Sequence, residues 1–124
     1  GNLMPDYNYT VLLDVRKICD EWCISELSDL FEAVDKADVL ACLPGNKPSE
    51  DSDDIEKIAW YFYNDSNEPI TIDLGCPTFR DTPFDITKGL HIFAAALIKN
   101  QPYINAHASG EVDWIDNFLW PHKV

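Results

Sequence analysis

The sequence predicts one α+β domain, in which a small mixed β-sheet follows N-terminal helices and carries an alanine-rich helix packed on it. Three patterns predict this fold class: apolar residues at helical spacing near the N-terminus, alternating apolar residues in the middle, and an alanine-rich segment before a last strand. The chain has 124 residues, a length typical of one domain. We expect a single domain over 1–124, with a helical N-terminal part over 1–50 and an α/β part over 56–124.

The composition argues against several classes of protein. The chain carries 22 Asp and Glu against 9 Lys and Arg, a formal net charge of −13. Direct binding to nucleic acid or anionic lipid is not expected, because both require a basic surface. The apolar content of 46% suffices for a packed core and argues against disorder. No apolar run reaches the roughly 18 residues of a membrane span, so we expect no membrane contact.

The cysteines do not have the spacing of a metal site. Cys19 and Cys23 are close in sequence, but a second pair of ligands is missing, since Cys42 and Cys76 stand alone. We interpret all of them as small apolar residues that stay reduced in the cytoplasm. The sequence therefore predicts a cytoplasmic protein with no metal and no cofactor.

Two helices are expected in the first part of the chain. Residues 11–23 place apolar side chains at steps of three and four, and Ser25 is expected to cap a second helix over 24–37. The acidic residues of these helices form an expected acidic face: Asp20, Glu21, Glu26, Asp29, Glu32 and Asp35. Because no base lies between Lys17 and Lys36, this face is either a solvated surface or a negative patch that docks a basic protein partner.

The middle of the chain is expected to form a loop and a hairpin. Two prolines, a glycine and clustered acids predict a loop over 44–54. Alternating residues in 56–64 and in 69–74 predict two antiparallel strands joined by a turn.

The last third is expected to form a helix, a strand and a short helix. Thr87 is expected to cap the alanine-rich helix over 88–100, followed by a strand over 103–108 and a helix over 111–119. The residues expected in the core are Leu30, Phe31, Ile58, Trp60, Phe62, Ile72, Phe93, Ala96, Leu97, Ile104 and Ile115.

Residues 86–96 (ITKGLHIFAAA), with the strand segments on either side, carry a family resemblance. They resemble the C-terminal part of the ParB/sulfiredoxin-like superfamily, with small bacterial and phage-type members as the best match. That family has a strand, a loop, an Asp-Gly-x-His-Arg motif opening an alanine-rich helix, and a strand. The resemblance implies a nucleoside triphosphate pocket at the helix start, where free N–H groups and an arginine bind phosphate. Thr87, Lys88, Gly89 and His91 are therefore the candidate anion- or nucleotide-binding residues.

The chain departs from this motif at the positions that matter for phosphate. Lys88 replaces the acidic residue, Ile92 replaces the arginine, and Leu90 stands where sulfiredoxins carry their reactive cysteine. The loss of one charged hydrogen bond costs about 1.5–3 kcal/mol. We therefore expect a degenerate site without sulfinic-acid reduction. His91 is an anion donor, a general base, or a structural group that ties a turn carbonyl to the helix start.

Three functions are compatible with these observations. The favoured one is a non-catalytic acidic interaction protein on a ParB-like scaffold, which uses the acidic face and aromatics such as Trp114 and Trp120 against a basic partner. The second is an active nucleotide-binding protein or nuclease, with Asp73, Asp81 and Asp85 near the pocket as acids or magnesium ligands. The third is an acidic inhibitor that mimics nucleic acid, such as a phage counter-defence or immunity protein. The aromatic content is compatible with a homodimer.

Overall fold

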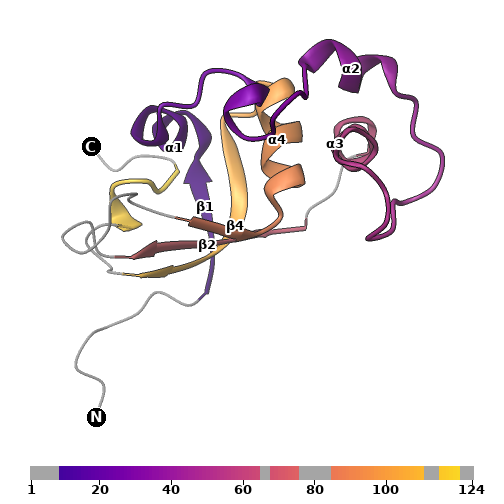
Figure 1. The fold of residues 1–124 in the computed structure, drawn as a ribbon. Helices are drawn as coiled ribbons and strands as arrows, with labels where there is room; N and C mark the ends of the chain where they lie inside the picture. The colour runs from indigo at the N-terminus through magenta and orange to yellow at the C-terminus, as the bar shows by residue number, and fades with distance from the viewer. Residues whose placement is uncertain (1–8, 65–67, 76–84, 111–114, 121–124) are drawn as a thin grey trace.

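The computed structural model describes residues 9–64, 68–75, 85–110 and 115–120. Within these ranges the chain forms four α-helices, one short 3₁₀ helix and one four-stranded sheet (Figure 1). In chain order the elements are β1 (Tyr9–Asp14), α1 (Val15–Trp22), η1 (Leu27–Asp29), α2 (Lys36–Ala41), α3 (Asp54–Tyr63), β2 (Ile70–Gly75), β3 (Asp85–Lys88), α4 (Leu90–Ile98) and β4 (Tyr103–Gly110).

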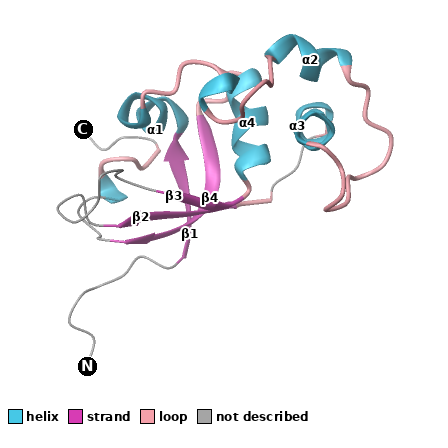
Figure 2. Cartoon of the chain, viewed as in Figure 1, coloured by secondary structure: helices cyan, strands magenta, loops and turns pink. Residues whose placement is uncertain are grey.

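The strand order in the sheet is β1-β4-β2-β3. β4 runs antiparallel to β1 and parallel to β2, and β2 runs antiparallel to β3, so the sheet is mixed as expected. All four α-helices lie on the same side of the sheet (Figure 2). No helix in the described ranges covers its other face. The α+β class is therefore confirmed, with the sheet in one layer and the helices beside it.

The first part of the chain differs from the expected pair of helices. Tyr9–Asp14 is a strand that pairs along its whole length with β4, so the helix expected over 11–23 is present only as Val15–Trp22. The chain changes from strand to helix at Asp14. The side chain of Asp14 accepts a hydrogen bond from the Lys17 backbone N–H at 2.9 Å and caps α1. The expectation that the first 50 residues are helical is therefore wrong, since they supply an edge strand.

The second expected helix is also interrupted. Residues 24–37 form the short helix η1 and then a turn with Ala33 at a positive φ of 59° before α2 begins. Ser25 does not cap a helix there; Glu26 is the N-cap of η1, and the Asp29 carboxylate accepts from the Ser25 and Glu26 backbone N–H groups. A residue with a positive φ does not continue a right-handed helix, so residues 24–37 do not form the one helix that was expected.

The segment over 56–64 is a helix and not a strand. Asp53 caps α3 by accepting from the Glu56 backbone N–H at 2.8 Å. Ile58 and Ala59 are fully buried and Phe62 is partly buried, which is the spacing of a helix face packed on α4. The expected hairpin is therefore wrong, and β2 pairs with β3 and β4 instead.

Helix α4 is the centre of the fold, because it packs on both sides. Phe93 and Ala96 belong to the core cluster shared with the sheet. Ala94, Ala95 and Ile98 belong to a second cluster shared with α2 and α3. Alanine side chains let neighbouring elements approach the helix axis closely on both faces.

The expected core is confirmed in part. The fully or almost fully buried members are Ile58, Ile72, Phe93, Ala96, Ile104 and Ile115. The partly buried members are Leu30, Phe31, Trp60, Phe62 and Leu97.

Strand β4 confirms the expected strand over 103–108 and extends it to Gly110. Of the helix expected over 111–119, residues 111–114 lie outside the described ranges, and 115–116 are helical. Residues 117–118 form a turn, and the Phe118 backbone N–H donates to the Ile115 carbonyl at 2.9 Å. Trp114 therefore lies outside the described residues. No helix within the described ranges has the length and apolar character needed to cross a membrane.

Candidate functional site

The expected anion-binding segment lies in a strand–turn–helix arrangement formed by β3, Gly89 and α4. Gly89 is the N-cap of α4 and has a left-handed backbone with φ 91°, so Thr87 is not the cap. A Cβ atom on Gly89 would lie 2.9 Å from Ile70 Cγ2 and 3.1 Å from Ile70 Cα. The turn requires glycine both for its positive φ and for this close contact with β2.

Strand β3 contains a β-bulge at Thr87, just before Lys88 and the N-cap Gly89. Thr71 pairs with Lys88, whereas the next residue, Ile72, pairs with Ile86, so Thr87 is an extra residue in β3. The Thr87 hydroxyl donates to the Thr71 carbonyl at 3.3 Å. The bulge therefore fixes Thr87 as part of the sheet edge.

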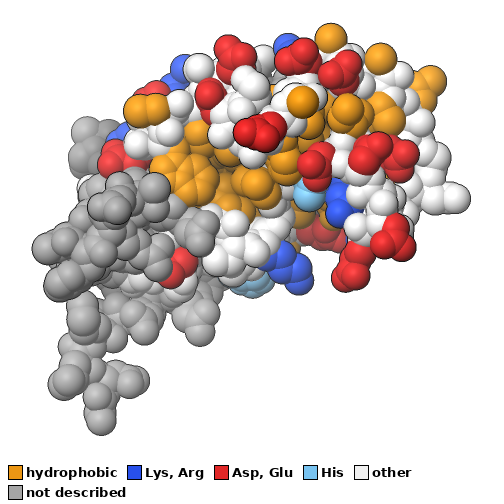
Figure 3. Space-filling view, viewed as in Figure 1, with side chains coloured by type: hydrophobic (Ala, Val, Ile, Leu, Met, Phe, Trp, Pro, Cys, Tyr) orange, Lys and Arg blue, Asp and Glu red, His pale blue; other side chains and the backbone are white. Residues whose placement is uncertain are grey.

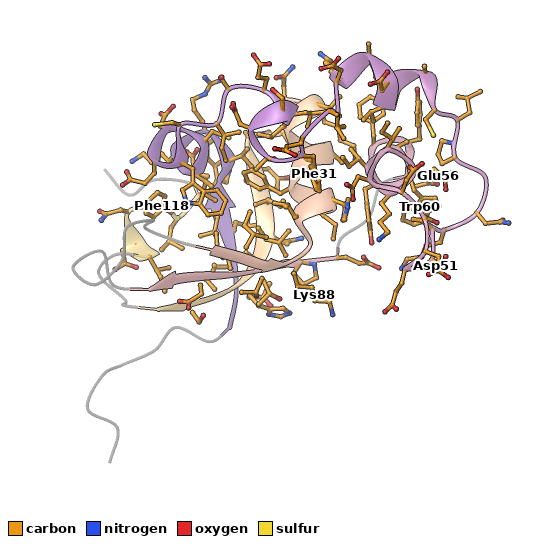
Figure 4. All side chains as sticks on the ribbon, viewed as in Figure 1. Phe31, Asp51, Glu56, Trp60, Lys88 and Phe118 are labelled. Atoms are coloured by element: carbon orange, nitrogen blue, oxygen red, sulfur yellow. The ribbon has the colours of Figure 1, made fainter. Side chains whose placement is uncertain are left out.

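Lys88 belongs to a row of side chains across the sheet. The register aligns Lys88 with Thr71, Thr71 with His107, and His107 with Thr10. His107 Nδ1 and Thr10 Oγ1 are 3.0 Å apart. Lys88 is exposed and lies at the lower edge of the sheet in the view of Figure 4. Lys88 therefore extends from the sheet and does not cap α4.

His91 is the motif residue with the most defined surroundings. Its Nε2 lies 2.9 Å from Asp54 Oδ1, at the start of α3. Its ring stacks on Phe31, with ring centroids 4.9 Å apart and an interplanar angle of 28°. Nε2 thus contacts a carboxylate from another helix and not a turn carbonyl. This contact joins α3, α4 and the loop after η1.

A cleft of about 730 Å³ opens beside the start of α4. Its lining includes five basic or imidazole side chains: Lys47, Lys57, Lys88, His91 and His107. Ile92 also lines it, so an aliphatic side chain occupies the position of the motif arginine. The fold brings lysines of the 44–54 loop and of α3 to the predicted site, although the sequence pattern did not assign them to it.

Two lysines of this cleft, Lys47 and Lys57, form hydrogen bonds with groups of the same chain. Lys47 Nζ lies 2.7 Å from Glu68 Oε1, and the Tyr61 hydroxyl donates to Glu68 Oε2 at 3.0 Å. Lys57 Nζ donates to the Glu50 carbonyl at 3.2 Å. The hydrogen bond from Lys47 lowers the pKa of Glu68, and the same bond raises the pKa of Lys47. Burial, and then the bond to Glu68, raise the pKa of Tyr61.

The acidic face is exposed along its whole length, but two members, Glu26 and Asp29, have structural roles. All six of its side chains are exposed, and they lie on α1, on η1 and in the loop that leads to α2. The pKa of Asp29 is lowered, first by the hydrogen bonds from the Ser25 and Glu26 backbone N–H groups. Asp29 therefore holds the start of η1. The Glu26 carboxylate also has a local partner, because it accepts from the Ser28 hydroxyl at 3.0 Å.

Two of the three carboxylates expected near the pocket lie opposite each other in the sheet. Asp73 of β2 pairs with Asp85 of β3 in the antiparallel register, and Asp81 lies outside the described residues. In the described ranges, no three His, Cys, Asp or Glu side chains converge in a group suited to a metal ion.

Sequence reasoning missed Asp54, Glu68, Lys47 and Lys57 as parts of this site. Asp54 is 37 positions from His91, and Lys47 is 21 positions from Glu68. No local spacing relates such pairs, because their proximity depends on how α3 packs on α4. Comparisons of the chain with protein-family models, with curated proteins and with solved structures found no match in any of the three.

Proposed function

We propose that this chain is a non-catalytic acidic interaction protein on a ParB-like scaffold, with a phosphate site that is no longer functional. The order β3, Gly89, α4, β4 supports the scaffold, since it has the strand, turn, alanine-rich helix and strand of the resemblance. Gly89 supports it further, because its positive φ and its contact with Ile70 give the turn a structural need for glycine.

The observation that carries the proposal is the bond between His91 and Asp54. A phosphate at the start of α4 would require its positive groups to be free. Instead, Asp54 Oδ1 lies 2.9 Å from His91 Nε2, and Glu68 lies 2.7 Å from Lys47. Ile92 stands at the arginine position, and carboxylates of the same chain contact His91 and Lys47, two of the groups that a phosphate would need.

The charge distribution supports a basic partner. The formal net charge is −13, and Asp20, Glu21, Glu26, Glu32 and Asp35 are all exposed. Within the described part of the chain none of these five acids belongs to an ion pair. A surface of one sign attracts a partner of the opposite sign over a distance of about one Debye length.

A nucleotide titration tests the degenerate site. We expect no rise in melting temperature with millimolar magnesium nucleoside triphosphates, because a ligand that binds only the folded state raises its stability. Asp54→Asn keeps the shape of the side chain and removes its charge, so this variant is the matched control. Stabilisation of the unmodified chain by a nucleotide would contradict the proposal, whereas stabilisation of Asp54→Asn alone would support the blocking role of the carboxylate.

A binding experiment tests the interaction role. A partner captured from the source organism should be lost on going from about 50 mM to about 500 mM salt, because screening shortens the range of the attraction. The double variant Glu21→Lys, Glu32→Lys should capture less of it, while Lys17→Arg keeps the charge and should capture the same amount. If the amount of captured partner changes with neither the salt concentration nor the charge reversal, the proposal of a basic partner is contradicted.

Nucleotide binding is the second candidate, and one observation favours it. Lys47, Lys57 and Lys88 line a single cleft, although the chain has only 9 Lys and Arg against 22 acids. A triphosphate would have to displace Glu68 and Asp54 from their present partners. The titration above decides between the two candidates, and loss of any nucleotide-induced stabilisation in Lys88→Ala would assign the site.

A further inference from the structure

The end of the molecule formed by α2 and α3 carries most of the exposed large hydrophobic side chains of the described residues. In the described residues four large hydrophobic side chains are exposed, and three of them lie here: Leu40 at 39%, Leu43 at 82% and Tyr63 at 44%. The Tyr63 hydroxyl donates to the Leu40 carbonyl at 2.6 Å, which joins the end of α3 to the end of α2. We call these three residues the α2–α3 patch. Exposed apolar side chains at one end of a protein are a feature of binding surfaces.

Acidic side chains lie at the start of α3, the helix that ends with Tyr63. One cation lies on this helix as well, since Lys47 Nζ is 5.6 Å from the centroid of the Trp60 ring. Glu56, Trp60 and Tyr63 are spaced by four and three residues, so they share one face of α3. Asp51, Asp53 and Glu56 are exposed at the start of that helix. Figure 4 shows Glu56 and Trp60 on the same side of α3, with Asp51 below them. In Figure 3 hydrophobic side chains at this end of the molecule are bordered by Asp and Glu.

We infer that the α2–α3 patch and the acids Asp51, Asp53 and Glu56 together bind a basic amphipathic helix of a partner protein. This inference rests on the proposed function and specifies the surface and the partner chemistry. An amphipathic helix places apolar residues at steps of three and four and lysines beside them. Its apolar side would cover Leu40, Leu43 and Tyr63, and its lysines would meet the acids.

The charge of the surface selects this occupant over two others. A second copy of this chain would bring the same acids to the interface and would be repelled by a molecule of net charge −13. A nucleic acid or an anionic lipid surface would be repelled for the same reason. A basic amphipathic helix is stabilised on this surface both by the apolar contact and by attraction between its lysines and the acids.

The acidic face expected from the sequence lacks this combination. Its helices keep their large apolar side chains inward: Leu27 is buried, and Trp22, Leu30 and Phe31 are partly buried. Binding energy at protein interfaces concentrates in a few apolar or aromatic side chains, while charges at the rim mainly steer the approach. The acidic face then assists the encounter, and the α2–α3 patch supplies the contact.

The test uses a fluorescent helical peptide of about 18 leucines and lysines, with leucines at steps of three and four. Leu43→Asp adds a negative charge to the patch at a side chain that is 82% exposed and outside any helix. Charge attraction alone predicts equal or tighter binding by this variant, whereas docking on the patch predicts binding weakened by about tenfold. Asn117→Asp adds the same charge at an exposed position of the segment that Figure 1 draws in yellow, at the opposite end, and should bind like the unmodified chain.

Circular dichroism and melting temperature confirm that both variants fold, and a scrambled peptide of the same composition measures charge attraction alone. Equal binding by the unmodified chain and Leu43→Asp, with a loss of binding in salt, would overturn the inference but leave the proposed function standing. No binding of the peptide to any of the proteins would overturn both.

Discussion

His91 Nε2 lies 2.9 Å from Asp54 Oδ1, so the first turn of α4 is joined to the first residue of α3 across 37 positions of the chain. The Phe31 ring covers the imidazole from the loop after η1. Three segments that are remote in sequence therefore meet at one side chain. This side chain also lines the cleft at the candidate site, which couples the packing of α3 to the shape of the site.

The first prediction concerns the energy of this pair. Asp54→Ala, His91→Ala and the double variant should show a coupling energy of about 0.2–1 kcal/mol in urea denaturation, because the pair is only partly buried. Asp51→Ala, combined with His91→Ala, is the matched control and should be additive. Additive effects of Asp54→Ala and His91→Ala would show that the bond adds nothing to stability.

The second prediction concerns Gly89. Gly89→Ala should lower the free energy of unfolding by about 2 kcal/mol or more, since alanine is strained at a φ of 91° and its Cβ meets Ile70 at 2.9 Å. Gly45→Ala is the control, because a Cβ there has no atom within 4 Å, and its effect should stay within about 0.5 kcal/mol. Similar denaturation midpoints for the two variants would contradict the described turn.

The third prediction concerns pH. The pKa of Glu68 is held below its ordinary value of 4.5, mainly by the hydrogen bond from Lys47. A carboxyl with a lowered pKa in the folded state stabilises the protein above 4.5, and this contribution is lost as the pH falls through the lowered value. The difference in melting temperature between the unmodified chain and Glu68→Gln should therefore be constant near neutral pH and shrink in acid. A difference that grows in acid would contradict the ion pair.

The fourth prediction concerns thiol reactivity. Burial raises the pKa of Cys19 to about 11, with the neighbouring Asp20 as a smaller cause. At pH 8 about one Cys19 in a thousand is then a thiolate, the form that reacts with iodoacetamide. Peptide mass spectrometry of the folded chain should find Cys23, which is exposed, alkylated well before Cys19. Equal rates in the folded chain would contradict the described burial of α1.

The sequence predicted the elements whose pattern is set locally. Ile70 and Ile72 are buried and alternate with Thr71 and Asp73, so β2 was readable from period two alone. The alanine-rich helix was readable as well, because helix propensity and burial agree there. The exact start of this helix could not be predicted, since the bulge at Thr87 depends on how β3 pairs with β2, where Lys88 lies opposite Thr71.

The wrong predictions have a common physical cause. In the run from Ile58 to Tyr63, the large apolar residues Ile58, Trp60 and Phe62 stand at every second position, which is typical of a strand. Ile58, Ala59 and Phe62 also fit one face of a helix, and contact with α4 selects the helix. Residues 11–14 form a strand because β4 lies beside them, and that partner is about ninety positions away. Tertiary contacts decide such ambiguous segments, and local spacing carries no information about them. The candidate site follows the same rule, since Gly89 and His91 were visible in the motif but Asp54 was not.

The position of β4 in the sheet has a consequence for how the protein is made. β4 is the last described strand in the chain, yet it lies between β1 and β2 and provides the hydrogen-bonding edge for both. While a ribosome is still translating residues 103–110, β1 has no neighbouring strand among the described ones. The pairing of β1 and the completion of the sheet therefore await the synthesis of β4, and closing so long a loop makes folding slow compared with a helical bundle of the same size.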